Sequence, residues 1–359
     1  MKRSIFKTLV FLAVLLITAS CGKDDTEPME KGYNQGVFIS CEGAFNGNNG
    51  SISWYNPESD EIINNLFLKV NGRPAGDVVQ SLTLADEYGV LVANNSGKIE
   101  IVEMETFESV AVITELSYPR HFVYAGNGKG YLSNGSAEGE VYKIDLTTAS
   151  VTDTIEVGMG PEEMVISGNY LFVANSGGWS FDNTVSVIDI TTDQVIKVIT
   201  VGDIPVSVVS CSQGNIWVLC RGKVVYNESW TEIIDETDSR LVRINPATMS
   251  VDRDIVTGEK GDGFNPSWLN ICPEGNTLYF GEADGLYAMD SDLGTAPDSP
   301  LITEYFSYAG KDPASGRIMA VKVTDFSSPG SLNIYEGDEL LSTMETGIGP
   351  GRIVFVQKK

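Results

Sequence analysis

The stretches VYKIDLTT, residues 141–148, and VSVIDITT, residues 185–192, are two close copies of one phrase. Five looser copies begin at Ser51, Ile99, Arg240, Leu286 and Ser331. Equivalent positions of successive copies lie 42 to 47 residues apart, except for one interval of 56 residues. A period of about 40–45 residues that contains only short strands is typical of a four-stranded propeller blade. The seven copies therefore predict an all-β fold, a seven-bladed β-propeller of four-stranded blades.

One repeat, residues 161–202, shows the strands of a blade most clearly. EEMVISG, YLFVAN, TVSVIDIT and QVIKVITVG each alternate or run apolar, and Gly or Asn separates them, as expected for strands joined by turns. The first blade begins with a second-strand pattern, residues 37–41, whereas GRIVFVQ, residues 351–357, is a first-strand pattern without the rest of a blade. We predict that these two segments pair and close the ring, because closure removes the open edges of the sheets.

The interval of 56 residues locates an insertion in the fifth blade. Residues 221–240, RGKVVYNESWTEIIDETDSR, are predicted to form a long loop between its second and third strands. Residues 258–266, GEKGDGFNP, form a second and shorter extension. Long loops on a compact frame are often functional, so both segments are candidates for contact with a ligand.

The N-terminus has the features of a secretion signal. Basic residues at positions 2, 3 and 7 precede an apolar run, residues 9–17, which is too short to span a bilayer as a helix. Small residues at positions 18 to 20 then precede Cys21. We predict that residues 1–20 are a signal peptide, that residues 21–35 are an acidic tether, and that residues 36–359 form the propeller.

The small residues before Cys21 resemble the signals of bacterial lipoproteins, although Thr18 stands where an aliphatic residue is usual. The resemblance implies that Cys21 is lipidated, and an anchor with several acyl chains would be stable. The alternative is an ordinary cleaved signal followed by a chance cysteine. Lys23, Asp24 and Asp25 resemble the signal that sends some lipoproteins to the outer face. We therefore expect an outer-membrane lipoprotein that faces the exterior and touches the membrane through its lipid anchor only.

The chain is strongly acidic, with a formal net charge of −25. Removal of the signal makes the mature chain more negative, because residues 1–20 contain three basic residues and no acidic one. An acidic surface of this kind repels nucleic acid and anionic lipid, so we expect no nucleic-acid partner. The charge by itself indicates solubility rather than a cationic ligand.

Catalytic groups are scarce in this sequence. With a single histidine, His121, a Ser-His-Asp catalytic triad or a multi-histidine metal centre is hard to build. Cys41, Cys211, Cys220 and Cys272 lack metal-site spacing and are expected to be buried free thiols, although export would permit disulfides. Residues 162–163 are adjacent glutamates, which are usually solvated rather than catalytic. We therefore expect a protein that is not an enzyme and that carries no metal or cofactor of its own.

The loops at one face of the ring are the expected ligand site. In an up-and-down blade, the connections from fourth to first strand and from second to third strand emerge on the same face. These connections are rich in aromatic rings, amides and arginines, which suit a large, partly apolar ligand with amide or hydroxyl groups. The candidate ligand-binding residues are Phe45, Asn46, Arg73, Asn94, Arg120, His121, Asn134, Asn175, Trp179, Arg221, Tyr226, Trp230, Phe264, Trp268, Tyr305 and Phe326.

Several of these candidates have an equally simple structural interpretation. Asn94, Asn134 and Asn175 recur at one position of the repeat, and asparagine commonly holds a loop through its side-chain hydrogen bonds. His121 is either a ligand to a metal within a bound cofactor or, more simply, a hydrogen-bonding residue of its loop. The sequence leaves these alternatives open.

The strings YLFVANSGG and TVSVIDITTDQVIKVITVGDIPVSV resemble the surface-layer-type repeat propellers, whose hallmark is a Tyr-Val-Thr-Asn-like (YVTN) strand. The resemblance covers residues 36–357, and it implies a fold rather than a chemistry. The opening GVFISCEGAFNGNNGSISWYNPES, together with the lipoprotein leader, resembles a narrower group, the cobalamin-capturing surface lipoproteins of BtuG type. Four residues depart from the Asn expected at the repeat position, namely Cys41, Cys220, Glu282 and Lys322.

This second resemblance implies that the loop face binds cobalamin or a related corrinoid with high affinity and passes it to a TonB-dependent outer-membrane transporter, as part of vitamin B12 uptake. Cobalamin would be a transported ligand and not a cofactor. Two other functions suit the same fold. A glycan- or protein-binding surface propeller would use the same aromatic face, and a lactonase- or lyase-type enzyme would need catalytic groups that the sequence barely provides.

Overall fold

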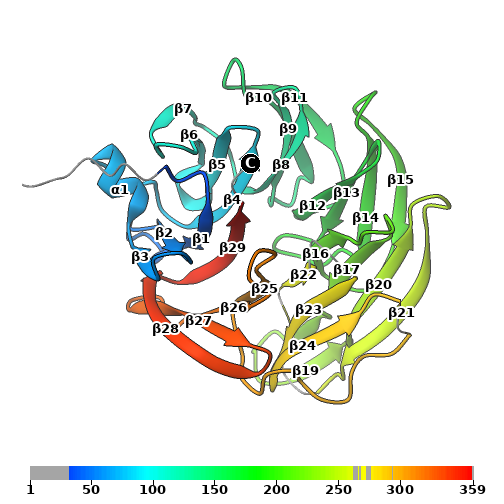
Figure 1. Ribbon diagram of the computed structural model, residues 1–359. Helices are drawn as coiled ribbons and strands as arrows, with labels where there is room; N and C mark the ends of the chain where they lie inside the picture. Colours follow the sequence, from blue (N-terminus) through cyan, green and yellow to red (C-terminus); the bar gives the residue numbers. More distant parts are fainter. Residues whose placement is uncertain (1–31, 262–265, 267, 272–275, 293, 358–359) are drawn as a thin grey trace, which may run out of the picture. The chain divides into compact units, whose positions relative to one another are not determined.

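The computed structural model describes residues 32–261, 266, 268–271, 276–292 and 294–357. Within these residues, seven β-sheets are arranged in a ring, and an additional two-stranded sheet projects from one of them (Figure 1). The ring belongs to a compact unit that starts at Tyr33. The predicted signal peptide, Cys21 and most of the predicted tether lie outside the described residues.

The first three blades each contain four strands. Blade 1 has the order β29 (Pro350–Val356), β1 (Gly36–Cys41), β2 (Ser51–Asn56) and β3 (Glu61–Ile63). Blade 2 contains β4 (Val79–Ala85), β5 (Tyr88–Ala93), β6 (Lys98–Glu103) and β7 (Ser109–Ile113). Blade 3 contains β8 (Pro119–Gly126), β9 (Lys129–Asn134), β10 (Glu140–Asp145) and β11 (Ser150–Glu156).

The remaining four blades follow the same path. Blade 4 contains β12 (Pro161–Ser167), β13 (Tyr170–Asn175), β14 (Thr184–Asp189) and β15 (Gln194–Thr200). Blade 5 contains β16 (Pro205–Ser210), β17 (Ile216–Cys220), β20 (Ser239–Asn245) and β21 (Ser250–Gly258). Blade 6 contains β22 (Leu269–Ile271), β23 (Thr277–Glu282) and β24 (Gly285–Asp290), and blade 7 contains β25 (Tyr308–Lys311), β26 (Ile318–Lys322), β27 (Pro329–Glu336) and β28 (Glu339–Ile348).

The predicted ring closure is confirmed. β29 pairs with β1 in antiparallel register, with Phe38 opposite Val354 and Ile39 opposite Ile353. The last strand of the chain thus completes the first blade, and the two ends of the ring are joined by one sheet (Figure 1). All-β architecture with seven blades is the fold that the repeat predicted.

The repeated phrase is a third strand followed by a side-chain-capped turn. The Oδ1 atom of Asp145 accepts hydrogen bonds from the backbone N–H of Thr147 at 2.8 Å and from its hydroxyl at 2.6 Å. Asp189 and Thr191 repeat both bonds one blade later, at the same two distances. These bonds lower the pKa of the Asp145 and Asp189 carboxyls. The phrase recurs because every blade needs the same tight turn from its third to its fourth strand.

The core lies between adjacent blades and is built mainly from second and third strands. All but the first residue of β13 is buried, and so is every residue of β17. Phe172 of β13 packs in one cluster with Val208 and Val218 of the next blade. Trp217 of β17 is fully buried. Apolar contact between neighbouring sheets therefore holds the ring together.

The structure departs from the sequence-based picture in three places. The insertion at residues 221–240 is not an unstructured loop, because it contains the hairpin β18 (Val224–Tyr226) and β19 (Ile233–Glu236). In blade 6, three strands are described. In place of a fourth, outer strand, the described residues form a single β-bridge between Leu286 and Ile302. A short helix that the repeat did not predict, α1 (Leu66–Asn71), follows β3.

Cys41, Cys211 and Cys220 are buried free thiols, as expected, and Cys272 lies outside the described residues. Burial raises the pKa of Cys41 to about 11 and that of Cys220 to about 12, so these thiols are protonated and unreactive at neutral pH. Among the described residues, no helix combines the length and the apolar character that a membrane span requires.

Candidate ligand-binding site

The site is built by a β-bulge that recurs in the first strand of several blades. Cross-strand pairing jumps from Pro119 to Phe122 in β8, from Pro161 to Met164 in β12, and similarly near the start of β4, β16 and β29. A bulge inserts extra residues on one strand and redirects their side chains. The residues that the pairing skips are Gln80, Arg120, His121, Glu162, Glu163, Val206 and Gly351.

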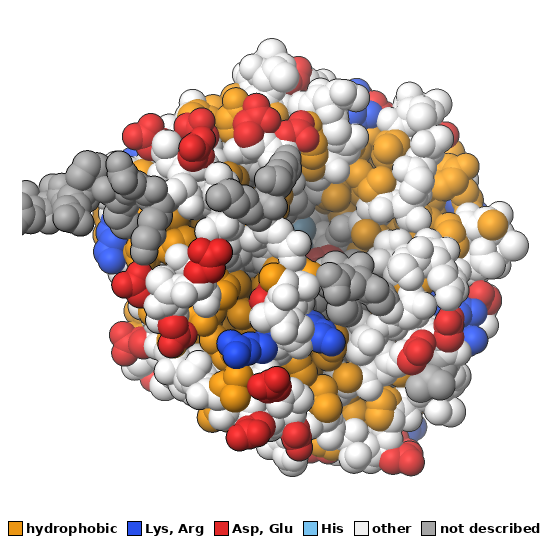
Figure 2. All heavy atoms as spheres, in the orientation of Figure 1, with side chains coloured by type: hydrophobic (Ala, Val, Ile, Leu, Met, Phe, Trp, Pro, Cys, Tyr) orange, Lys and Arg blue, Asp and Glu red, His pale blue; other side chains and the backbone are white. Residues whose placement is uncertain are grey.

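All but one of these skipped residues line a cavity of about 410 Å³. The connections from second to third strands complete its wall, so the two groups of loops converge as expected. The ring is visibly hollowed near its centre (Figure 2). The lining residues are Glu42, Gln80, Arg120, His121, Glu162, Val206, Arg221, Trp268, Tyr305, Ser307, Val323, Phe326, Gly349, Pro350, Gly351 and Arg352.

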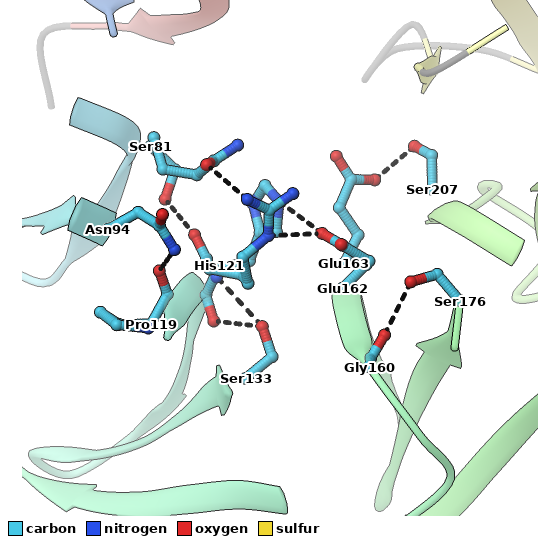
Figure 3. Close-up of polar contacts among 12 residues, drawn as sticks. Ser81, Asn94, Pro119, His121, Ser133, Gly160, Glu162, Glu163, Ser176 and Ser207 are labelled. Carbon is cyan, nitrogen blue, oxygen red and sulfur yellow. Dashed lines mark hydrogen bonds and ion pairs between the residues drawn. The ribbon is translucent and has the colours of Figure 1, made fainter. Parts of the chain in front are cut away.

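Two ion pairs organise the wall of the cavity. The Nε atom of Arg120 lies 2.8 Å from the Glu162 Oε2, and its Nη1 donates to the Gln80 Oε1 at 3.0 Å. Arg352 of β29 pairs with Glu163 of β12, so this ion pair joins blade 1 to blade 4. In Figure 3, Glu162 points toward His121, whereas Glu163 points toward Ser207. The adjacent glutamates therefore take different partners.

Glu163 is buried and not solvated, contrary to the expectation for adjacent carboxylates. It accepts hydrogen bonds from the Ser207 hydroxyl and from the backbone N–H of Val208, the latter at 3.1 Å, and it pairs with Arg352. Burial raises the pKa of its carboxyl, and Arg352 offsets part of that effect. Glu163 lies on β12 and its partners lie on β16 and β29, so its carboxyl joins three blades at the channel.

His121 is a buried bulge residue of β8. Its backbone N–H donates to the Ser133 hydroxyl at 3.0 Å, and its Nε2 lies 4.0 Å from the Glu162 Oε2 (Figure 3). Burial, followed by the positive charges of Arg352 and Arg120, holds the pKa of this imidazole well below 6.5. The side chain is therefore neutral at physiological pH.

Acid should destabilise the protein through His121. The unfolded side chain takes up a proton near pH 6.5 and the folded one does not, so stability falls as pH drops below that value. We expect this group alone to remove about 1.4 kcal/mol of unfolding free energy between pH 7.5 and 5.5. Urea denaturation of the wild type and of His121→Gln at both pH values measures it. Equal pH dependence in the two proteins would contradict the assignment.

The rim of the loop face carries exposed aromatic rings. Trp179 is 84% exposed, Trp230 78% and Phe45 71%. Phe326 is more than half exposed, and it lines the cavity together with the partly exposed Tyr305. Exposed rings of this size cost hydration free energy and contribute little to folding, so rings on several loops of the same face are candidates for a binding surface.

The hairpin β18–β19 carries one of these rings in a strained conformation. Trp230 has a φ of 58°, in the left-handed region that bulky residues rarely adopt. Its ring stacks on that of Tyr226 with centroids 5.5 Å apart and planes at 27°. Its backbone N–H donates to the Asn227 carbonyl at 3.0 Å, which fixes the tight turn. The hairpin thus presents two stacked rings to solvent at the cost of backbone strain.

The repeated asparagines hold the loops together. Asn94 donates through Nδ2 to the Pro119 carbonyl at 2.9 Å. Asn134 accepts from the Tyr118 N–H at 3.0 Å and donates to Glu140 and Tyr142, both at 2.9 Å. Asn175 donates to Thr184 and Ser186, both at 3.0 Å. The three asparagines therefore stabilise the loops through side-chain hydrogen bonds, and none of their side chains lines the cavity.

The other candidates lie in different surroundings. Arg73 binds Glu100 with two hydrogen bonds, 2.6 and 2.9 Å, away from the cavity. Asn46 accepts from the Asn95 amide at 3.0 Å on the exposed rim. Trp268 is only 2% exposed, and its Nε1 donates to the Phe306 carbonyl at 3.0 Å, so it supports the cavity wall from the core. Phe264 lies outside the described residues.

The structure therefore brings together six of the sixteen candidates around the cavity: Arg120, His121, Arg221, Trp268, Tyr305 and Phe326. Sequence reasoning did not select Gln80, Glu42, Glu162 or Arg352 as ligand-binding residues. The signal that would have found two of them, Glu162 and Arg352, is a proline at the start of a first strand followed by polar residues, as at Pro161 and Pro350.

Fold and site together define a closed seven-bladed β-propeller with a ligand-sized cavity where its loops converge. The chain matches a family model described as "Domain of unknown function (DUF5074)" over residues 35–313. The match covers most of the chain, and the protein therefore belongs to this family. No curated protein matches the chain.

Solved structures show similarity in fold. A quinoprotein alcohol dehydrogenase-like protein of Bacteroides thetaiotaomicron aligns with a TM-score of 0.65 and 13% identity, over 91% of this chain and 80% of that one. Dihydro-heme d1 dehydrogenase NirN, in complex with DHE, aligns with a TM-score of 0.56 and 11% identity, over 92% and 77%. A Kuenenia stuttgartiensis hydrazine synthase chain aligns at 0.45 and 22% identity, over 58% of this chain and 60% of its own length. Identities this low establish the propeller fold alone.

Proposed function

We propose that this protein is a surface lipoprotein that captures a corrinoid such as cobalamin on its loop face, without catalysing a reaction. The observation that carries the proposal is a polar cavity lined by the half-exposed ring of Phe326, together with the exposed rings of Trp179 and Trp230 on other loops. Rings provide a large contact area at low entropic cost and suit the edge of a broad apolar macrocycle.

The size and polarity of the cavity fit part of such a ligand. A volume of about 410 Å³ lies in the range of small-molecule pockets but is too small for a whole corrinoid. The cavity would hold one arm of the ligand while the aromatic rim covers its body. Polar groups at the cavity wall, including Gln80 and Arg221, are suited to the amide and oxygen groups that decorate a corrinoid.

The sequence features of the N-terminus complete the proposal. A lipid on Cys21 would hold the protein on the outer membrane, and the acidic tether would let the propeller sample the exterior. Preformed loops keep the ordering cost of binding low and so favour high affinity. Release would then require a partner, for which we propose a TonB-dependent outer-membrane transporter.

Co-elution of a coloured ligand tests the proposal simply. Corrinoids absorb visible light, so the purified protein mixed with cyanocobalamin should emerge from a size-exclusion column as a coloured peak. Bovine serum albumin treated in the same way is the control for nonspecific carry-over. A colourless protein peak at micromolar concentration would contradict corrinoid capture.

A glycan-binding function is the second candidate, because one observation favours it. The Trp230 ring is 78% exposed and stacks on Tyr226, with centroids 5.5 Å apart, and its outward face is the kind of surface on which a sugar ring packs. A glycan array probed with the same purified protein separates the two functions. Specific glycan binding without retention of cyanocobalamin would replace the corrinoid proposal.

A further inference from the structure

Arg221 differs from the other arginines of the cavity because no carboxylate of the described residues lies at ion-pair distance from its guanidinium, although Glu162 acts on it from farther away. Arg120 is neutralised by Glu162 at 2.8 Å, and Arg352 by Glu163. The Nε atom of Arg221 is buried and makes no hydrogen bond. A buried donor without a partner is costly, and it usually indicates a group that is satisfied only in a bound state.

The backbone around Arg221 is held in place by hydrogen bonds. Its backbone N–H donates to the Ile204 carbonyl at 3.0 Å, and that of Gly222 donates to the Asp203 carbonyl at 3.1 Å. Gly222 has a φ of 73°, and a Cβ at this position would meet the Thr237 carbonyl, so the chain is fixed directly after Arg221. The arginine therefore lies at the rigid base of the β18–β19 hairpin, whose tip carries the stacked rings.

The charges across the cavity leave room for an anion at this position. Glu42 lines the same cavity, but burial raises the pKa of its carboxyl, and the arginines that act on it are Arg120 and Arg352. Burial also lowers the pKa of the Arg221 guanidinium, and Glu162 offsets only part of that cost, which a bound anion would reduce further. A planar guanidinium with free donors is the preferred partner of a phosphate or carboxylate.

We propose that Arg221 binds an oxyanion of the ligand, and that in cobalamin this is the phosphodiester that links the corrin ring to the lower nucleotide. This inference rests on the proposed corrinoid function and adds a subsite to it. The arginine would seat the phosphate in the cavity while the rings of the hairpin contact an apolar part of the same ligand. The protein would thus select complete corrinoids over fragments that lack the phosphate.

The test compares cyanocobalamin with dicyanocobinamide, which lacks the phosphodiester and nucleotide, by calorimetric titration of the whole chain after Cys21. Wild type should bind cyanocobalamin at least about tenfold more tightly than cobinamide, the difference expected for a hydrogen-bonded charge. Arg221→Met should lose this preference by weakening cyanocobalamin binding alone, and Arg221→Lys should retain part of it. The melting temperature of Arg221→Met should fall little, because the Arg221 Nε makes no hydrogen bond and no close ion pair is lost.

Arg243→Met is the matched control, since Arg243 forms an ion pair with Asp252 at 2.7 Å outside the cavity and should leave both affinities unchanged. An Arg221→Met protein that still prefers cyanocobalamin, or that weakens both ligands equally, would overturn the phosphate subsite and leave corrinoid capture standing. Failure of the wild type to bind either corrinoid would overturn both the subsite and the function on which it rests.

Discussion

Replacement of Glu163 by alanine should lower the free energy of unfolding by about 3–5 kcal/mol, the cost of removing one partner of a buried ion pair. The change leaves the Arg352 guanidinium buried without its carboxylate and removes the acceptor of the Ser207 hydroxyl and the Val208 N–H. Because Arg352 belongs to β29, the effect falls on the strand that closes the ring. Urea denaturation followed by the fluorescence of the buried tryptophans measures it.

The neighbouring glutamate provides the matched control. The pair of Glu162 and Arg120 is somewhat more exposed than that of Glu163 and Arg352, so Glu162→Ala should cost less than Glu163→Ala. The double variant Glu163→Ala/Arg352→Met should recover part of the loss, since it removes both charges together. If the single Glu163→Ala variant does not fold, Glu163→Gln provides the comparison at a smaller cost. Equal stability of the two glutamate variants would refute the role of Glu163 as a link between blades.

Replacement of Trp230 or Trp179 by alanine should weaken cyanocobalamin binding about 30-fold or more, as expected for a central aromatic residue of an interface. Neither change should lower the melting temperature appreciably, because both side chains are almost fully exposed. Trp230→Ala should leave the backbone strain in place, because alanine keeps the Cβ that disfavours a φ of 58°. Calorimetric titration and thermal unfolding of the same preparations give both quantities.

An exposed apolar residue elsewhere on the ring controls for a general loss of apolar surface. Val198 lies on the outer strand β15 and is 54% exposed, so Val198→Ala should leave the affinity unchanged. Unchanged affinity in both tryptophan variants would remove the two loops from the site. Loss of affinity with an equal loss of stability would indicate a structural role instead.

The fold was predictable because its determinants are local and repeated. The turn held by Asp145 and Thr147 lies within one phrase of sequence, and its recurrence counts the blades. The closing strand β29 was also predictable, since a first-strand pattern without the rest of its blade must pair with the blade that lacks one. Neither inference required knowledge of a contact between side chains distant in the chain.

The site was predictable only in part, because the direction of a side chain depends on register and on distant partners. The chain path placed Arg120 and Arg221 on the correct face. Pairing of Arg73 with Glu100, 27 residues away, and of Trp268 with the Phe306 carbonyl, 38 residues away, could not be read from local patterns. The bulge that turns Arg120 and His121 toward the channel leaves only an indirect trace in the sequence, the polar residues after Pro119, and the cross-strand register establishes it.

Calorimetric titration of cyanocobalamin into the purified wild-type protein tests the central claim most directly. The loop face, with its exposed rings and its cavity of about 410 Å³ where the loops converge, predicts one tight site per chain. One-to-one binding with a dissociation constant below a micromolar, retained at high salt because most of the contact is apolar, is the expected result. Absence of heat at micromolar protein would contradict corrinoid capture while leaving the propeller fold intact.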